Sequence, residues 1–316
     1  MNLPALHFFV PRLRRWAFDL GFSARAARRQ RGVRMLMHHG IDGKFPASRF
    51  EEQLLWLKDT CTILPMGEVV TLLKNKKPLP DFAAVLTFDD GLRNNLTEAH
   101  PLLVKHQVPA TFFVCPGLTG TGQWIWTYEM RERLKTLGTE QLATLASRVC
   151  GSPLDSINAF VSWMKKQPNA VRQQAVEQVR NTTAGFVPSP QQRRDYDLMS
   201  WDELQSLDHR LITLGSHTMS HPILTSLTEE EIEAELKDSK EALVSRGLME
   251  ADNALICYPD GANDERVLAS ARRHYAGACS TRKGLINGNS PLHALPRIGA
   301  NSKIEDVSWR LWRPGA

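Results

Sequence analysis

The sequence of 316 residues lacks any segment that is long and apolar enough to cross a bilayer as a helix. It also lacks a cysteine framework, since its five cysteines are odd in number and include no Cys-x-x-Cys pair. Four of them, Cys61, Cys115, Cys257 and Cys279, lie in or beside apolar runs that are typical of strands. We therefore expect a globular protein with buried, free thiols, and neither a disulfide scaffold nor a catalytic cysteine.

The N-terminus also lacks the pattern of a secretory leader. The apolar run from Leu3 to Val10 is short and interrupted by His7, and the arginines follow this run where they should precede it. No small-residue cleavage site is evident in this stretch. These features predict a protein that is not exported by this route and is cytoplasmic.

Positive charge is concentrated at the N-terminus, although the net charge of the chain is only +5. Residues 1–34 contain eight arginines and a single acid, Asp19, together with several aromatic residues: Phe8, Phe9, Trp16, Phe18 and Phe22. Two interpretations remain open, a solvated arm or helix that packs on the domain, and a peripheral contact with an anionic membrane surface. Nucleic-acid binding is disfavoured because the run is short and no matching basic patch follows.

Short apolar runs alternate with amphipathic stretches along most of the chain. The runs expected to form strands are Met35–His39, Thr62–Leu64, Ala83–Phe88, Ala110–Cys115, Leu211–Gly215, Ala254–Tyr258 and Gly277–Thr281. Two helix starts carry capping-box signatures, Ser48 with Glu51 and Thr228 with Glu231. This alternation predicts an α/β fold with a mainly parallel sheet, and its repetition favours an irregular (β/α) barrel over an open sheet.

Residues 120–198 interrupt the alternation because they contain no strand-like run. We expect helices at Tyr128–Leu137, Glu140–Val149, Leu154–Lys166 and Ala170–Thr182, and interpret the segment as a helical insertion between two barrel strands. Insertions of this kind commonly shape a substrate site. The expected organisation is a basic helical segment over residues 1–32, a main domain over 33–300 that contains the insertion, and a tail over 301–316.

The motif Thr87-Phe88-Asp89-Asp90-Gly91 ends an apolar strand with two carboxylates and a glycine turn. The carboxyl ends of parallel strands are where α/β proteins place their sites. Side chains of neighbouring residues on extended backbone point in different directions. Two adjacent aspartates therefore suit two roles, one as a metal ligand and one as a general base, although Asp-Gly is also an ordinary turn dipeptide.

A histidine pair, in His217-Thr218-Met219-Ser220-His221, follows another apolar strand. Two histidines at this spacing are able to bind one metal ion, and Pro222 indicates that they sit on a loop or short turn. One carboxylate and two imidazoles leave metal positions open for water activation. The same set formally matches non-haem iron oxygenases, but a second carboxylate beside the metal favours hydrolysis, in which a base has a task.

Thr-Phe-Asp-Asp-Gly and His-Thr-x-x-His, in this order and on these strands, resemble the motifs of the polysaccharide deacetylases of carbohydrate esterase family 4, the NodB homology domain. The resemblance runs from about Val33 to Ile298. It implies a distorted (β/α) barrel and metal-dependent removal of acetyl groups from N-acetylated sugars. By position, Asp89 resembles the base, and Asp90, His217 and His221 resemble the ligands of a divalent metal. Zn²⁺ is the usual ion, with Co²⁺, Ni²⁺ and Mn²⁺ as alternatives.

The third motif of that family, Arg-x-Pro-Tyr-Gly, is replaced here by Cys257-Tyr258-Pro259-Asp260-Gly261. The proline and glycine are kept, so we expect Pro259, Asp260 and Gly261 to form the oxyanion and substrate loop, with the Asp260 N–H as donor. The arginine that orients the base in the family is missing from this motif. Arg297, in Leu295-Pro296-Arg297-Ile298, is a candidate for its role.

The final motif of the family, a Leu-x-x-His pattern that supplies the general acid, has no clean copy in this sequence. His293 and His39 both remain candidates for that acid. His39 follows the strand that opens the main domain, where many members of the family have Tyr-His and this chain has His38-His39.

The leading hypothesis is a hydrolase that removes N-acetyl groups from an amino-sugar glycan or glycolipid precursor of the cell envelope. Two alternatives remain: an amide, imide or O-acetyl hydrolase on the same fold, and a carbohydrate-binding pseudoenzyme. The intact ligand set and base argue against a pseudoenzyme, because such a protein has no need of Asp89.

Overall fold

The computed structural model describes residues 13–22, 25, 31–154 and 156–312. Its strands are β1 (Arg34–His38), β2 (Thr62–Ile63), β3 (Ala83–Phe88), β4 (Ala110–Val114), β5 (Ile212–Ser216), β6 (Leu255–Cys257), β7 (Gly277–Cys279) and β8 (Ile298–Gly299). The first seven lie within one or two residues of the runs expected from the sequence. Strand β8 has only two residues, so no apolar run in the sequence predicts it.

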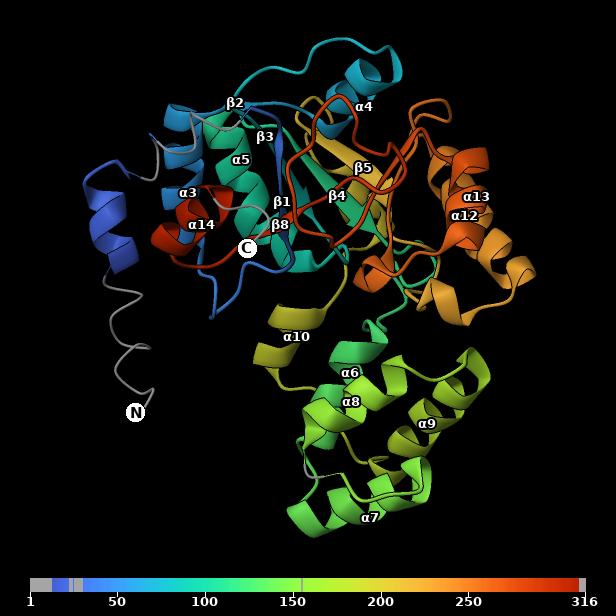
Figure 1. The fold of residues 1–316 in the computed structure, drawn as a ribbon. Coiled ribbons are helices and arrows are strands. Elements are labelled where there is room, and N and C mark those ends of the chain that lie inside the picture. Colours follow the sequence, from blue (N-terminus) through green and yellow to red (C-terminus); the bar gives the residue numbers. More distant parts are fainter. Residues whose placement is uncertain (1–12, 23–24, 26–30, 155, 313–316) are drawn as a thin grey trace, which may run out of the picture.

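All pairs of neighbouring strands in the sheet are parallel, in the order β7-β6-β5-β4-β3-β1-β8, with β2 beside the start of β3. A parallel bridge between Cys279 and Leu295 links the β7 edge to the segment that leads into β8. The sheet therefore curls toward closure (Figure 1). The expected fold class, a distorted (β/α) barrel, is confirmed.

Two apolar layers hold the barrel together, and they follow the period-two alternation of strand side chains. In β3, Ala84 and Leu86 belong to the larger core beneath the outer helices, whereas Ala83 and Val85 belong to a smaller core on the other face of the sheet. Because both faces of the sheet are covered, the sequences of the strands are continuous apolar runs. This burial fixes the strand register and hence the edge at which all the strands end.

The barrel helices are α3 (Ala47–Thr60), α4 (Met66–Lys74), α5 (His100–His106), α11 (Trp201–Gln205), α12 (Glu229–Val244), α13 (Glu265–His274) and α14 (Ile304–Trp312). Three shorter turns accompany them, η1 (Asn95–Ala99), η2 (Leu224–Ser226) and η3 (Pro259–Gly261). The capping box of Thr228 with Glu231 is present at the start of α12.

The cap expected at Ser48 is wrong. The cap position is two residues earlier, at Pro46, so that helix α3 begins at Ala47, and no side chain caps it. Pro46 lies at φ −70°, which presets the entry into the helix, and Ser48 is already inside the first turn. The Glu51 carboxylate is instead bound by Lys105 and His106 of α5.

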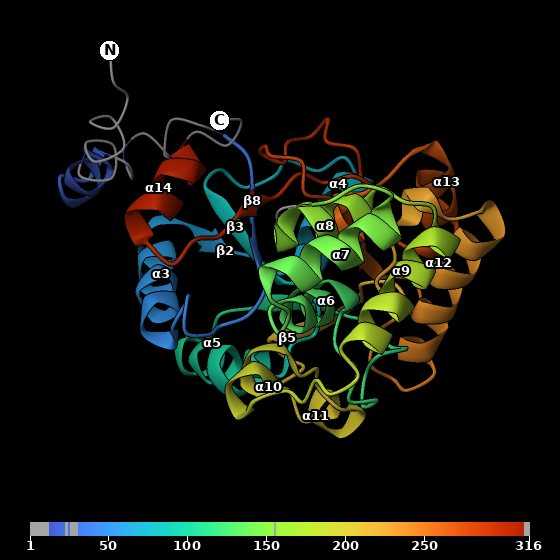
Figure 2. The same cartoon turned by 90° about the horizontal axis from the view of Figure 1, so that it is seen from below.

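Five helices lie between β4 and α11 in the sequence: α6 (Trp126–Leu134), α7 (Thr139–Cys150), α8 (Ile157–Lys165), α9 (Asn169–Thr182) and α10 (Pro190–Tyr196). Helices α6 to α9 share a core of their own, with Met130, Leu145, Phe160 and Val179 fully or almost fully buried. Figure 1 shows this bundle below the edge of the barrel at which the strands end, and in Figure 2, which is seen from below, the bundle lies in front of the barrel. It is therefore placed to cover that edge.

Both ends of the described chain meet on one side of the barrel. Residues 13–19 are helical and lie beside α3 and α14. The stretch expected as a tail contains α14, whose Ile304, Val307 and Leu311 are buried. The run from Leu3 to Val10, with Phe8 and Phe9, lies outside the described residues. No helix in the described part of the chain is long and apolar enough to cross a membrane.

Candidate metal centre and active site

The two aspartates leave the end of β3 through a tight turn. The Asp89 N–H donates to the carbonyl of His38 at 2.9 Å, which continues the strand pairing. Asp90 then has φ +75° and Gly91 has φ +68°. A Cβ at Gly91 would lie 3.0 Å from Val114 Cγ1, so both the turn and the packing require glycine. This geometry points the two carboxylates in different directions.

The two histidines leave β5 on an irregular loop that is fixed by polar contacts. The Thr218 Oγ1 accepts from the His221 N–H at 3.1 Å, and Thr218 itself has φ +66°. Glu235, on α12, accepts from the N–H groups of Met219 and Ser220 at 2.8 and 3.1 Å. The loop therefore holds its shape through a side chain from the neighbouring helix.

Asp90, His217 and His221 converge at the carboxyl edge of the sheet. Their ligand atoms lie within 4.8 Å of one another and all three residues are buried. Asp90 Oδ1 lies 3.3 Å from His217 Nε2 and 3.4 Å from His221 Nε2. The structure thus brings together the three residues that the sequence suggested as metal ligands.

The chemistry of this donor set fits a divalent metal. The Nδ1–H of His217 donates to the Cys257 carbonyl at 2.7 Å. Since a neutral imidazole carries one N–H, this bond leaves Nε2 with a lone pair that faces Asp90. Metal-binding histidines are commonly oriented by such a bond from the other ring nitrogen. Two imidazole nitrogens and a carboxylate oxygen suit Zn²⁺ and neighbouring transition metals alike.

The charges of the cluster reinforce one another. Burial acts to raise the pKa of Asp90, but hydrogen bonds from His217 and His221, which form when Nε2 carries a proton in place of a metal, hold that pKa well below its usual value. Burial acts to lower the pKa of His217, but its bond to Asp90 and the charge of Asp89 raise it. Protons and a metal therefore compete for the same imidazole nitrogens, as in other sites of this kind.

Asp89 is paired with Arg297, which lies just before β8. The guanidinium donates from Nη1 to Asp89 Oδ1 and from Nη2 to Oδ2, both at 2.7 Å. Both side chains are buried. Burial alone would raise the pKa of Asp89, but the charge and hydrogen bonds of Arg297 hold it below its usual value. The carboxylate is therefore ionised and fixed in orientation.

Arg297 is also satisfied on its remaining sides. Its Nε donates to the Ser280 carbonyl at 2.9 Å, its Nη1 to Thr87 Oγ1 at 3.1 Å, and its Nη2 to Cys257 Sγ at 2.8 Å. Cys257 stands at the position of the family's usual arginine. Asp89, His217 and Cys257 also have ligand atoms within 4.8 Å. Arg297 engages both the carboxylate and the sulfur of that group, which leaves Asp90, His217 and His221 as the better metal set.

The helical bundle contributes two side chains that sequence reasoning did not single out as functional. Tyr128, on α6, donates from its hydroxyl to Asp90 Oδ2 at 2.5 Å. Trp126, at the start of α6, donates from Nε1 to the His221 carbonyl at 3.2 Å. Burial and the charge of Asp90 raise the pKa of Tyr128 well above its usual value, so it remains a donor. No local pattern distinguishes this tyrosine from a packing residue.

The candidates for the general acid lie in different places. His39 follows β1 and lines a cavity of about 270 Å³ together with Tyr128, Tyr196 and Asp195. His293 is half-buried, and its Nε2–H donates to the Tyr275 carbonyl, before β7 begins. That carbonyl is at the opposite end of the strands from Asp89 and Asp90. The structure therefore brings His39, and not His293, toward the metal cluster.

The loop Pro259–Gly261 follows β6 and belongs to the same edge of the sheet as the cluster. Asp260 has φ +54°, and its carboxylate lies 2.6 Å from Lys165 Nζ of α8. Gly261 has φ +68°, and a Cβ there would lie 2.2 Å from Thr281 Oγ1. The glycine thus determines the shape of this loop, and Lys165 ties the loop to the bundle.

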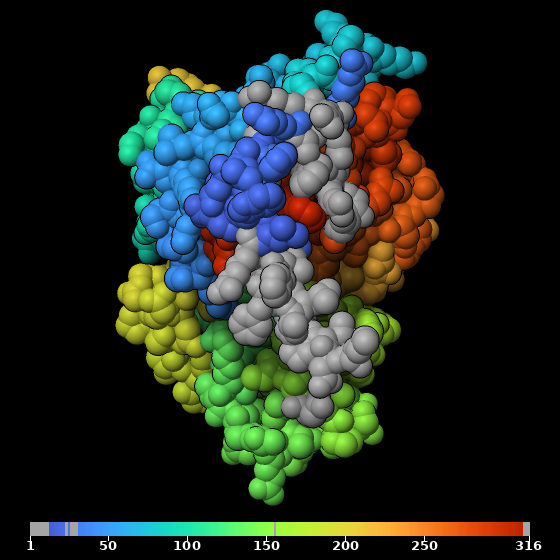
Figure 3. Space-filling model, turned by 60° about the vertical axis from the view of Figure 1, so that its left-hand side comes forward, coloured from blue at the N-terminus to red at the C-terminus, as the bar shows by residue number. Residues whose placement is uncertain are grey.

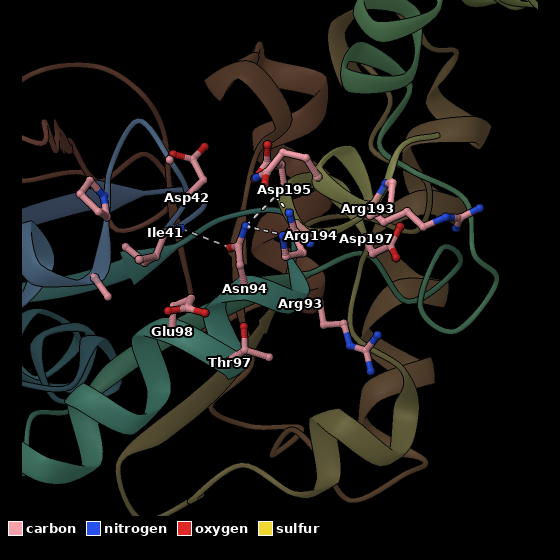
Figure 4. A pocket seen from close by; sticks show the side chains of 15 residues that line it. Ile41, Asp42, Arg93, Asn94, Thr97, Glu98, Arg193, Arg194, Asp195 and Asp197 are labelled. Atoms are coloured by element: carbon pink, nitrogen blue, oxygen red, sulfur yellow. Dashed lines mark hydrogen bonds between the residues drawn. The ribbon is translucent and has the colours of Figure 1, made fainter. Parts of the chain in front are cut away.

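A second, larger cavity adjoins the first. It measures about 720 Å³ and shares Asp42 and Asp195 with the cavity that contains His39. Figure 4 shows its lining: side chains from the loop after β1, from η1 and from α10 surround Asn94, which bonds to the backbone of Ile41, Arg194 and Asp195. Arginines, acids and amides all belong to its lining, so the cavity offers hydrogen-bond donors and acceptors to a polar ligand.

A curled parallel barrel with an Asp-His-His cluster and a paired carboxylate at the carboxyl ends of its strands is the arrangement of an α/β-barrel hydrolase. A family model described as polysaccharide deacetylase matches residues 76–152 and 153–276. The chain belongs to the polysaccharide deacetylase family and is a hydrolase of carbon–nitrogen bonds other than peptide bonds. Members of this family depend on a metal, and the Asp-His-His cluster is a possible site for it.

Similar proteins agree with this assignment. YxkH of Bacillus subtilis (strain 168), a provisionally assigned polysaccharide deacetylase, is 21% identical over 271 residues, which cover 84% of this chain and 70% of YxkH. The deacetylase PplD of Streptococcus pyogenes, solved with acetate, matches with a TM-score of 0.55 and 21% identity over 90% of this chain and 98% of PplD. IcaB of Ammonifex degensii matches with a TM-score of 0.59 and 16% identity over 90% and 98%. At these identities the two structures support the fold.

Proposed function

We propose that this protein removes N-acetyl groups from an amino-sugar glycan, with Asp90, His217 and His221 as the ligands of a divalent metal and Asp89 as the general base. The observation that carries the proposal is the pairing of two differently held carboxylates at one edge of the sheet. Asp90 faces two imidazoles, whereas Asp89 is held by Arg297. Zn²⁺ is the ion we favour, and Co²⁺, Ni²⁺ and Mn²⁺ fit the same donors.

The chain's own residues divide the work of hydrolysis. A bound divalent metal polarises a carbonyl and lowers the pKa of water. Asp89 accepts the proton of the attacking water, and Arg297 keeps its carboxylate ionised and correctly turned for that task. The backbone N–H of Asp260, in the loop tied to Lys165, is the proposed donor to the oxyanion.

His39 is the proton donor that we favour for the leaving amine. Its exposed ring lines the cavity next to Tyr128, which in turn bonds to Asp90. His293 is the weaker candidate because its ring is engaged with Tyr275. His39→Gln is expected to lower kcat on amide substrates while His293→Gln leaves it unchanged. The reverse result would transfer the role to His293.

The two cavities favour a substrate longer than one sugar. The smaller cavity, of about 270 Å³, is connected to the cluster through Tyr128, whose hydroxyl bonds to Asp90, and has aromatic walls in Tyr128 and Tyr196, whose rings stack at 5.0 Å. The larger cavity continues from it through Asp42 and Asp195. We propose that the reacting N-acetylhexosamine occupies the smaller cavity and that the neighbouring sugars occupy the larger one.

Acetate release from N-acetylhexosamine oligomers tests this function. We expect activity that is lost on chelation, restored by Zn²⁺ and abolished in Asp89→Asn, which preserves the size of the side chain. Metal-dependent activity that survives Asp89→Asn would exclude the proposed base. Turnover of O-acetylated sugars or cyclic imides, with none of N-acetylated sugars, would favour the alternative amide, imide or O-acetyl hydrolase.

The cysteines bear on the compartment in which the enzyme works. No disulfide joins cysteines among the described residues, and this includes Cys257 and Cys279, which are register partners in neighbouring strands. We propose that the protein works in a reducing compartment such as the cytoplasm, on a precursor destined for the cell envelope. Five titratable thiols in the freshly purified, denatured protein are expected; a Cys257–Cys279 disulfide in cells would contradict the proposal.

A further inference from the structure

The segment of residues 13–22 concentrates exposed apolar side chains on one face. Seven large apolar side chains are exposed in the described part of the chain, and four of them belong to these ten residues. Leu13 and Trp16 are each 57% exposed, Leu20 is 48% exposed and Phe22 is 47% exposed. The rings of Trp16 and Phe22 lie 6.0 Å apart. We call these four side chains the outward face.

The spacing of the outward face is helical. Leu13, Trp16 and Leu20 stand at positions i, i+3 and i+7, which share one side of a helix, and residues 13–19 are helical in the structure. An ordinary surface helix turns such a stripe toward the core. Here the stripe stays exposed, and Figure 3 shows the deep blue atoms of this segment on the surface of the molecule.

The opposite side of the same segment is anchored to the domain. Arg14 Nη1 lies 2.8 Å from Asp306 Oδ1 on α14, and its guanidinium lies over the Trp309 ring at 5.5 Å. Ala17 is buried, and the Phe18 ring lies 6.0 Å from Trp56 of α3. The orientation of the outward face is therefore fixed by contacts, and the apolar stripe is not free to turn inward.

The stretch of sequence that carries this face is rich in arginine. Residues 1–34 contain eight arginines against one acid, Asp19. Of the arginines that the structure describes in this stretch, Arg15, Arg25 and Arg31 are exposed; Arg15 is paired with Asp19, and Arg31 with Asp81. Tryptophan, phenylalanine and leucine beside arginines form the composition of segments that lie in the interface of a bilayer with anionic lipids. A contact between two copies of this face would bring two arginine-rich stretches of like net charge together, which is unfavourable.

We propose that residues 13–22 bind the surface of an anionic bilayer and dock the enzyme there. The anchor residue Asp306 lies on α14, which follows β8 directly, and Arg297 immediately precedes β8. A membrane-bound outward face is thereby held in a fixed relation to Asp89. This inference deepens the proposed function, since it presents the active site to amino-sugar glycans that are attached to lipids.

Vesicle co-sedimentation of the full chain tests the inference. The probes are vesicles of phosphatidylcholine alone and vesicles with equal parts of phosphatidylcholine and phosphatidylglycerol. We expect binding to the anionic vesicles that weakens with added salt. Trp16→Ser/Leu20→Ser should lower the partition coefficient by about tenfold or more, because binding scales with the apolar area that enters the interface. Val171→Ser/Val187→Ser is the matched control, since it removes one exposed apolar side chain from α9 and one from the loop between α9 and α10, and should bind like the wild type.

Three results would overturn the proposal: no binding of the wild type to anionic vesicles, equal binding of Trp16→Ser/Leu20→Ser, or a dimer in sedimentation equilibrium that this variant dissociates. Acetate release from a soluble N-acetylated oligomer separates the two proposals. Both double variants should retain the wild-type rate, because neither change touches the cluster. If the wild type shows no such activity, the proposed function fails, and the vesicle data still decide the membrane contact.

Discussion

Removal of the Asp89–Arg297 pair offers the sharpest test of how the active site is built. Arg297→Met deletes the guanidinium and keeps much of the side-chain volume, and Asp89→Asn deletes the opposite charge. Both native side chains are buried and joined by two bonds of 2.7 Å. Removing one partner of such a pair leaves a buried charge without compensation, which costs about 3–5 kcal/mol. We expect this cost in the free energy of unfolding for either single variant.

The double variant Asp89→Asn/Arg297→Met should be more stable than the sum of the single effects implies. Since it buries no lone charge, we expect its stability to return to within about 2 kcal/mol of the wild type. Urea unfolding in the presence of a chelator, followed by tryptophan fluorescence, measures these values without a contribution from bound metal. Additive single effects, or single costs below about 1 kcal/mol, would refute the reasoning, because contacting buried charges cannot be independent.

The stability of the wild type and of Arg297→Met should depend on pH in a direction that follows from the pKa of Asp89. In the wild type the pKa of Asp89 is held below the value of 3.8 that the unfolded chain has, so its contribution to stability is present above that value and is lost as the pH falls through the folded pKa. In Arg297→Met, burial without the arginine raises the pKa of Asp89. The variant therefore takes up a proton as the pH falls. The difference in the free energy of unfolding between the wild type and Arg297→Met should be largest near neutral pH and should become smaller as the pH falls.

Three further predictions follow from single contacts. Glu235→Gln removes the charge that holds the His217–His221 loop at the N–H groups of Met219 and Ser220. This change should weaken zinc affinity by about 10-fold to 100-fold in a competition assay with a chromogenic chelator. Unchanged affinity would show that the loop keeps its shape without the Glu235 charge. Gly261→Ala places a Cβ 2.2 Å from Thr281 Oγ1 at φ +68°. It should lower the free energy of unfolding by about 1–3 kcal/mol, as measured by thermal unfolding. Gly43→Ala is the control, because open space surrounds the new Cβ there. Thr97→Trp fills the larger cavity from η1, and should raise KM for long N-acetylated oligomers and not for a disaccharide; equal effects on both would remove that cavity from the substrate path.

Much of the metal cluster was predictable from the sequence because its elements are local. The Asp89-Asp90-Gly91 turn follows directly from an apolar strand, and the histidine spacing lies within one loop. Each motif carries its chemistry within five residues, and parallel strands bring their carboxyl ends to one edge. The fold class followed from the same alternation of apolar runs and helices. The cap at Ser48 failed because Pro46, two residues earlier, already starts the helix.

The supporting residues were not predictable in the same way. Tyr128 bonds to Asp90 across 38 positions of sequence, and Glu235 holds the histidine loop from the far side of β5. Nothing in the local pattern of either residue separates it from an ordinary helix position. Their roles depend on which helix faces the cluster, and that is set by the packing of the bundle and of α12 against the barrel.

The sequence by itself determined the strands, the ligand types and the presence of a basic, aromatic N-terminus, because periodicity, turn chemistry and composition are properties of neighbouring residues. The sequence named Arg297 as a candidate partner of Asp89, but only the tertiary structure decided that the two side chains, 208 positions apart, are paired. Only the structure decided that Leu13, Trp16 and Leu20 face outward, since the docking of Arg14 and Ala17 onto the domain selects the buried side. Both outcomes depend on contacts between distant segments, which the closure of the barrel fixes and which no local pattern encodes.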